Sequence, residues 1–180
     1  MQYSVSIASR SSVSPLSLQE AKRELDVTFD DDDSLIQTYL EQATSFVEQH
    51  TNLFLVPVVL DLFADRLNGS LLLPYGPVTG VQSINVAGVA VSGFRAIGGS
   101  PYAVLPPIGQ PWPYTAMGAG IGEVVVRYEA GYAEGKAPAG LLAAVRAVLS
   151  IYYDKPQGQE LRQSWDAVDR SLIPFRLRSL

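Results

Sequence analysis

Apolar residues spaced three and four positions apart indicate helices in the first and last thirds of the chain. One such stripe lies within Leu35–Val47 and forms the single apolar face of an amphipathic helix. A second lies within Leu141–Tyr153 and follows Pro138, whose fixed φ and missing N–H suit a first helical turn. Ahead of both, Ser17–Glu20 has the form of a capping box, which predicts a short helix that ends near Asp26.

The middle of the chain has the residue pattern of strands and not of helices. Between Pro57 and Tyr132, β-branched and aromatic residues occur in short runs separated by Gly, Pro and Asn, which is typical of strands and turns. The predicted strands are Val58–Ala64, Ser70–Leu73, Val81–Val86, Val89–Phe94, Tyr102–Leu105 and Glu123–Tyr128. Several prolines and glycines predict a long irregular loop over Pro106–Gly122.

The C-terminal residues combine arginines with apolar side chains. Beyond Lys155–Gly158, which should end the preceding helix, we expect a short helix over Ser164–Ser171, stopped by Pro174. Two interpretations remain open for the end of the chain. It is either a frayed end or a strap across its own core, or it is a docking segment that orders on a partner with an acidic and apolar surface.

This order of elements predicts an α+β fold. Helices from the two ends of the chain would pack on each other, with the strands inserted between them. We expect one domain with a small α-helical core, an inserted antiparallel β subdomain and an extended C-terminal tail. Its parts are 1–56 (N-terminal helices of the core), 57–134 (β insert), 135–156 (core helix) and 157–180 (C-terminal docking segment).

Composition and charge exclude several classes of function. The 180 residues carry a formal net charge of -5, which argues against a protein that grips nucleic acid through clustered Lys and Arg. There is no cysteine, which excludes disulfides, thiolate zinc sites and a cysteine nucleophile. Met1–Pro15 lacks the pattern of a secretory signal, and no apolar stretch reaches membrane-spanning length, so we expect a soluble protein.

Two local patterns suggest chemistry but favour structural roles. Asp30, Asp32 and Glu41 fall at calcium-loop positions, yet Leu35 replaces the required glycine, so we expect an acidic helix start without a metal. The one histidine, His50, lies where a helix should end and can meet carbonyl groups there. We expect no cofactor and no catalytic triad.

Two other classes of function remain as alternatives, a binding module and a hydrolase. A carbohydrate- or peptide-binding module would use aromatic side chains in or near the Pro-rich loop, namely Tyr102, Trp112 and Tyr114. A small hydrolase would need an acid dyad drawn from Asp61, Asp65, Glu123 or Glu129, and the sequence gives no reason to pair them.

Short motifs also follow one another along nearly the whole chain. They are Leu16-Ser17-Leu18-Gln19-Glu20-Ala21-Lys22, Asp30–Asp33, Asp33-Ser34-Leu35-Ile36, Phe46-Val47-Glu48, Leu73-Pro74, Pro77-Val78, Gly109-Gln110-Pro111-Trp112-Pro113, Val124–Tyr132, Pro138–Leu142 and Leu172-Ile173-Pro174-Phe175-Arg176. In this order they resemble the head-tail connector, or head-completion adaptor, family of long-tailed phages and gene transfer agents. Phe175 stands where relatives often have Tyr, and Leu177–Leu180 extends past the family pattern.

The resemblance implies a non-enzymatic structural adaptor of the virion neck that assembles in the host cytoplasm. Copies would form a homo-oligomeric ring, commonly of twelve, beneath the portal protein, and the ring would extend a channel through which DNA passes without specific binding. A tail-proximal stopper or tail terminator protein would follow. The C-terminal segment would dock into the portal, through Trp165, Arg170, Leu172, Phe175, Arg176 and Arg178. Deleting Ser164–Leu180 should then leave folding nearly intact and abolish attachment to heads.

Overall fold

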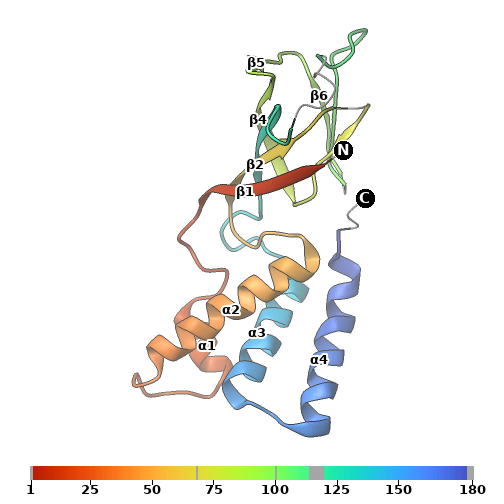
Figure 1. Cartoon of the computed structure of the whole chain (residues 1–180). Helices are drawn as coiled ribbons and strands as arrows, with labels where there is room; N and C mark the ends of the chain where they lie inside the picture. Colours follow the sequence, from red (N-terminus) through yellow and green to blue (C-terminus); the bar gives the residue numbers. More distant parts are fainter. Residues whose placement is uncertain (1, 68, 100, 114–119, 178–180) are drawn as a thin grey trace. The chain divides into compact units, whose positions relative to one another are not determined.

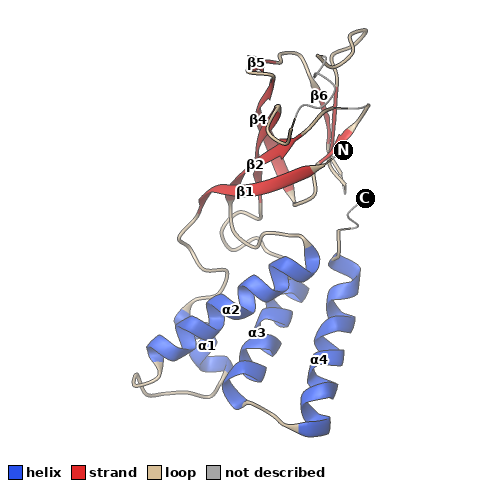
Figure 2. Cartoon of the chain, in the orientation of Figure 1, coloured by secondary structure: helices blue, strands red, loops and turns tan. Residues whose placement is uncertain are grey.

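The computed structural model of the chain describes residues 2–67, 69–99, 101–113 and 120–177, and they form two compact units. The helical unit contains Ser12–Val56 and Tyr132–Arg176. The sheet unit contains the N-terminal strand and the described part of Pro57–Gly131. Each unit therefore joins segments that lie far apart in the sequence, as the colours of Figure 1 show. The predicted α+β class is confirmed (Figure 2).

The helical unit contains both predicted amphipathic helices. Its elements are α1 (Leu18–Glu24), α2 (Asp33–Thr51), α3 (Ala139–Asp154), α4 (Gly158–Leu172) and the 3-10 turn η1 (Ile173–Phe175). The capping box at the start of α1 is confirmed, because Ser17 Oγ accepts from the Glu20 N–H at 3.2 Å and the Ser17 N–H donates to Glu20 Oε2 at 2.8 Å. Among the described residues, no helix combines the length and apolarity needed to cross a bilayer.

The apolar stripes of α2 and α3 form the core of this unit. α2 buries Ile36, Leu40, Ala43 and Val47, and α3 buries Leu141, Ala144, Val145, Val148, Leu149 and Ile151. Burying apolar area of this kind is the main favourable term in folding. The residues that follow α2 and α3 and cap their C-terminal ends, Asn52 and Lys155, lie in the left-handed region with φ of 57° and 49°.

The acidic run before α2 makes structural contacts. Lys22 Nζ lies 2.6 Å from Asp30 Oδ1 and 2.6 Å from Asp33 Oδ1. The hydrogen bond to Asp30, followed by that to Asp33, raises the pKa of Lys22. The Tyr153 hydroxyl donates to Asp32 Oδ2 at 2.9 Å. The run thus ties α1 and α3 to the start of α2, and the described residues contain no cluster of three or more His, Asp or Glu that could hold a metal.

The C-terminal segment is helical over most of its length, so the prediction of an extended tail is wrong for residues 158–175. Helix α4 packs against α3 and buries Val168 and Leu172, with Leu172 0% exposed. The physical reason is that the apolar side chains of this segment recur at helical spacing and fill the open side of α3. Removing Ser164–Leu180 would therefore expose part of the core, which contradicts the expectation that such a deletion leaves folding nearly intact.

The sheet unit contains two antiparallel sheets. The five-stranded sheet has the order β1-β2-β8-β4-β5, and the three-stranded sheet has the order β3-β7-β6. The strands are β1 (Tyr3–Arg10), β2 (Val58–Ala64), β3 (Leu71–Leu72), β4 (Val78–Val86), β5 (Val89–Ala90), β6 (Arg95–Ile97), β7 (Ala103–Leu105) and β8 (Val124–Ala130). β5 is shorter than the predicted strand Val89–Phe94, since only Val89 and Ala90 pair with β4.

The two faces of the larger sheet differ in chemistry. On one face the central strands bury apolar residues, including Leu60, Leu62 and Tyr128, and burial raises the pKa of Tyr128. On the other face Asp61 of β2 lies opposite Arg127 of β8. Arg127 Nε and Nη2 donate to the two Asp61 carboxylate oxygens, each at 2.7 Å.

Strand β1 was not predicted, since the segment 1–56 was assigned to helices of the core. Its signal is the alternation of Tyr3, Val5 and Ile7 with serines, which has the period of a strand but lies in a Ser-rich run. In the structure β1 pairs antiparallel with β2, from Tyr3↔Ala64 to Arg10↔Val58. The larger sheet therefore takes its outermost strand from the N-terminus.

Candidate docking surface on the helical unit

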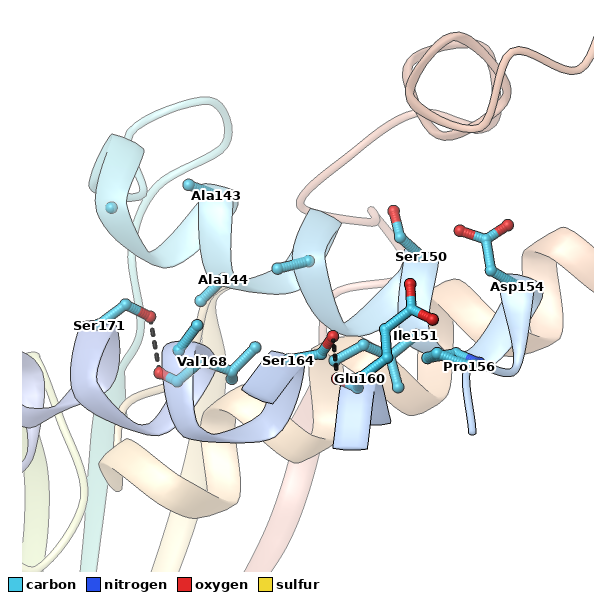
Figure 3. Close-up of a pocket in the computed structure, with 13 residues that line it drawn as sticks. Ala143, Ala144, Ser150, Ile151, Asp154, Pro156, Glu160, Ser164, Val168 and Ser171 are labelled. Carbon is cyan, nitrogen blue, oxygen red and sulfur yellow. Dashed lines mark hydrogen bonds between the residues drawn. The ribbon is translucent and has the colours of Figure 1, made fainter. Parts of the chain in front are cut away.

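Helices α3 and α4 enclose an open groove of about 550 Å³, which we call the α3–α4 groove (Figure 3). Small side chains form most of its lining: Gly140, Ala143, Ala144, Ala147, Ser150, Ile151, Asp154, Pro156, Glu160, Ser164, Ala167, Val168 and Ser171. Figure 3 shows Asp154, Pro156 and Glu160 at one end of the groove and Ser171 at the other.

The groove does not have the chemistry of an active site. The Ser164 hydroxyl donates to the Glu160 carbonyl at 3.0 Å and the Ser171 hydroxyl to the Val168 carbonyl at 2.7 Å. Both hydroxyls are satisfied by their own helix, and the lining holds no histidine, lysine or cysteine that would activate them. A surface of methyl groups and small hydroxyls is suited to receive side chains of a neighbouring protein.

Phe175 lies on its own helical unit. A Cβ atom on Gly140 would lie 2.7 Å from Phe175 Cζ, closer than real Cβ contacts. The absence of a side chain at Gly140 is therefore what lets the ring approach α3. Phe175 was predicted as a partner residue, and within its own chain it holds the turn after α4 against α3.

Trp165 also contacts its own unit. Its ring centroid lies 4.9 Å from that of Phe46 on α2 and 6.0 Å from that of Tyr152 on α3. His50 stacks on Phe46 at 3.8 Å, and His50 Nδ1 lies 2.9 Å from the Phe46 carbonyl oxygen. The expected helix-end role of His50 is confirmed, and the half-buried Trp165 joins α4 to α2 and α3.

The exposed side chains lie at the end of α4. Arg170 Nε donates to the Asp166 carbonyl at 3.0 Å, and Arg176 Nη2 lies 2.8 Å from Asp169 Oδ1. Between the two arginines, Ile173 is 60% exposed. We call Arg170, Ile173 and Arg176 the exposed C-terminal set. Arg178 lies outside the described residues.

The predicted partner residues therefore separate into two groups. Leu172 is fully buried in its own unit, and Trp165 and Phe175 contact the chain itself. Arg170 and Arg176 remain accessible. Sequence reasoning did not select Ile173 as a partner residue. The exposure of its side chain depends on the turn that begins where α4 ends, and nothing in the sequence distinguishes it from its neighbour Leu172.

Trp112, one of the aromatic residues considered for a binding platform, is not available for stacking on a ligand. Trp112 is 8% exposed, and its Nε1 donates to the Gly69 carbonyl at 2.6 Å, so the ring anchors the loop to its own unit. Tyr102 is half-buried. Tyr114 lies outside the described residues.

Three of the four carboxylates considered for a hydrolase, those of Asp61, Asp65 and Glu129, have other partners. Arg127 lowers the pKa of Asp61, chiefly by hydrogen bonding, and a lowered pKa is the reverse of what a general acid needs. Asp65 Oδ1 accepts from the Gln2 N–H at 3.0 Å, and Glu129 Oε1 accepts from Gln82 at 2.7 Å. These contacts give the acids structural roles.

The fold is similar to that of chains in gene transfer agent (GTA) particles. A chain in the virion of a native GTA particle matches with a TM-score of 0.75 and 21% identity, covering 98% of this chain and 96% of that one. A chain in the neck of an empty GTA particle computed with C6 symmetry matches with a TM-score of 0.73 and 20% identity, covering 100% and 97%. A chain in the neck of a native GTA particle computed with C12 symmetry matches with a TM-score of 0.72 and 19% identity, covering 97% of each.

The match to a sequence family covers a smaller part of the chain than the structural matches do. No curated protein matches the chain. Residues 15–85 match the family described as phage gp6-like head-tail connector protein, a structural family and not a family of enzymes. That range includes the capping box of α1 and the acidic run before α2, two of the motifs that carried the resemblance. Over residues 15–85 the chain is thus similar to the phage gp6-like head-tail connector family, the kind of family that its motifs resemble.

Proposed function

We propose that the chain is a structural adaptor of the neck of a phage-like particle, in which a ring of its copies lies beneath the portal, extends the DNA channel and links head to tail. The observation that carries this proposal is the family match at residues 15–85 combined with a fold shared over nearly the full length with neck chains of GTA particles. One of those necks was computed with C12 symmetry, so twelve copies is the expected ring size.

The portal contact is assigned to the end of α4. The exposed C-terminal set offers two guanidinium groups on either side of an apolar side chain. A complementary portal surface would carry carboxylates around an apolar hollow. The neighbouring α3–α4 groove adds a surface of small side chains against which a partner can pack closely.

The charge of the chain suits a channel that does not hold DNA. A net charge of -5 repels phosphates on average, so DNA would slide past the ring without specific binding. The far side of the ring would receive the tail-proximal stopper or tail terminator protein.

Omission of the chain from particle-producing cells tests the proposal. We expect DNA-filled heads and separate tails to accumulate, with joined particles reduced more than tenfold, and adding back the purified chain should restore joining in extracts. Counting joined particles by negative-stain microscopy gives the result. Normal joining without the chain would refute the proposal, whereas a failure to fill heads would point to an earlier role in packaging.

A further inference from the structure

Most side chains of the edge strand β1 are exposed to solvent. Of its eight residues only Val5 is half-buried, while Tyr3 is 43% exposed and Ile7 is 52% exposed. Within the part of the chain that the structure describes, β1 pairs only with β2 (Figure 1). An edge strand of this length presents a row of unpaired N–H and C=O groups that can accept another strand.

The hydrogen bonds at the start of β1 show which groups point to that free edge. Residues of an antiparallel pair alternate between exchanging both backbone bonds and exchanging none. The Asp65 N–H donates to the Gln2 carbonyl at 3.2 Å, so the next pair, Tyr3 with Ala64, exchanges none. The same holds two residues further on, at Val5. The backbone N–H and C=O groups of Tyr3 and Val5 therefore point away from β2.

The opposite edge of the sheet is also open. β5 covers only Asn85 and Val86 of β4, and the Val91 N–H reaches the Ile84 carbonyl. Among the described residues no strand pairs with the outer edge of β4 over residues 78–83. Neither this stretch nor residues 3–9 of β1 contains a charged side chain, so both edges lack the charges that usually prevent edge-to-edge pairing.

The two open edges are compatible in direction and face. Strand direction alternates along β1, β2, β8 and β4, so the two edge strands run in opposite directions. A second copy in the same orientation would thus place its β1 antiparallel to β4 of the first. One cross-strand row, Ser6, Asp61, Arg127 and Ser83, runs from one edge to the other on a single face.

We propose that β1 of one copy pairs with the outer edge of β4 of the next copy, so that neighbouring sheet units share one continuous antiparallel sheet around the ring. The inference rests on the proposed ring. The proposed contact joins two different edges of the sheet, so it repeats head to tail and can close into a ring. A two-fold contact would stop at a dimer. The occupant of the β1 edge is therefore a second copy of this chain.

Engineered disulfides test the contact, because the chain has no cysteine of its own. Ser4, Ser6 or Ser9 of β1 would be changed to Cys, each together with Ser83→Cys or Gly80→Cys on β4. All these positions lie on one face of the sheet, and a Cβ on Gly80 would meet Glu129 Oε2 at an ordinary 4.0 Å. Six pairings sample the registers in which two Cβ atoms come within bonding reach.

Each variant would be oxidised in isolated necks or assembled rings and separated on denaturing gels. We expect at least one pairing to convert more than half of the chain into a ladder of covalent multimers, and each single-cysteine variant to remain monomeric. Val5→Cys combined with Ser83→Cys is the matched control, since their side chains point to opposite faces and should give less than a tenth of that yield.

The outcomes are distinguishable. Assembled rings in which none of the six pairings links would overturn the shared sheet while leaving the proposed function standing. Dimers from a single cysteine on β1 would show that β1 pairs with itself and would also overturn it. If the chain is absent from necks and forms no rings, the proposed function fails first, and the inference fails with it.

Discussion

Replacing Leu172 by Ala is expected to lower the free energy of unfolding of the helical unit by about 2–5 kcal/mol. The side chain is 0% exposed and lies in the core against α3, so the change leaves a cavity. Its neighbour supplies a matched control: Ile173 is 60% exposed, and Ile173→Ala should change stability by no more than about 0.5 kcal/mol. Chemical denaturation of both variants measures the difference.

This comparison decides whether the end of the chain is a loose tail or part of the fold. Equal, small effects of the two substitutions would mean that α4 contributes little to the folded state. In that case the sequence-based expectation of a separable C-terminal segment would be restored.

Reversing the character of the exposed C-terminal set is expected to block joining of heads and tails while leaving the fold intact. Ile173→Asp places a carboxylate where an apolar hollow is proposed, and Arg176→Glu brings like charge to an acidic surface. Each should reduce joined particles at least tenfold, equivalent to about 1.4 kcal/mol of binding free energy. Add-back of each variant to extracts that lack the chain gives the measurement.

Ile108→Asp is the control for these variants, since Ile108 is 81% exposed and lies in the sheet unit. It should join heads and tails normally. Thermal unfolding should be nearly unchanged in all three variants, since the ion pair with Asp169 that Arg176→Glu removes is exposed to solvent. Normal joining by Ile173→Asp and Arg176→Glu would remove the docking role from the end of α4, whatever the place of the chain in the neck.

The helices of the core could be predicted because local signals and tertiary packing agree there. The capping box at Ser17 and the stripe that ends at Val47 specify α1 and α2 without knowledge of distant residues. The acidic run before α2 was predicted to have a structural role at the start of a helix. Its contacts with Lys22 and Tyr153 could not be predicted, because they depend on how the helices pack.

The missed features depend on contacts between distant segments. β1 exists because β2, which lies far along the chain, supplies its hydrogen bonds, and a strand of alternating serines has a weak local signal. Likewise, the sequence near the C-terminus shows apolar and basic residues but not which ones are covered. Leu172 and Ile173 differ in exposure because α3 covers one face of α4 only.

The most direct test of the account is to image the neck of particles that contain this chain, at a resolution that separates helices. We expect a ring of copies directly beneath the portal, with the end of α4 against the portal surface and β1 of each copy beside β4 of the next. Finding the chain in the capsid shell or the tail tube, or a neck whose density has no place for its helical and sheet units, would contradict the central claim.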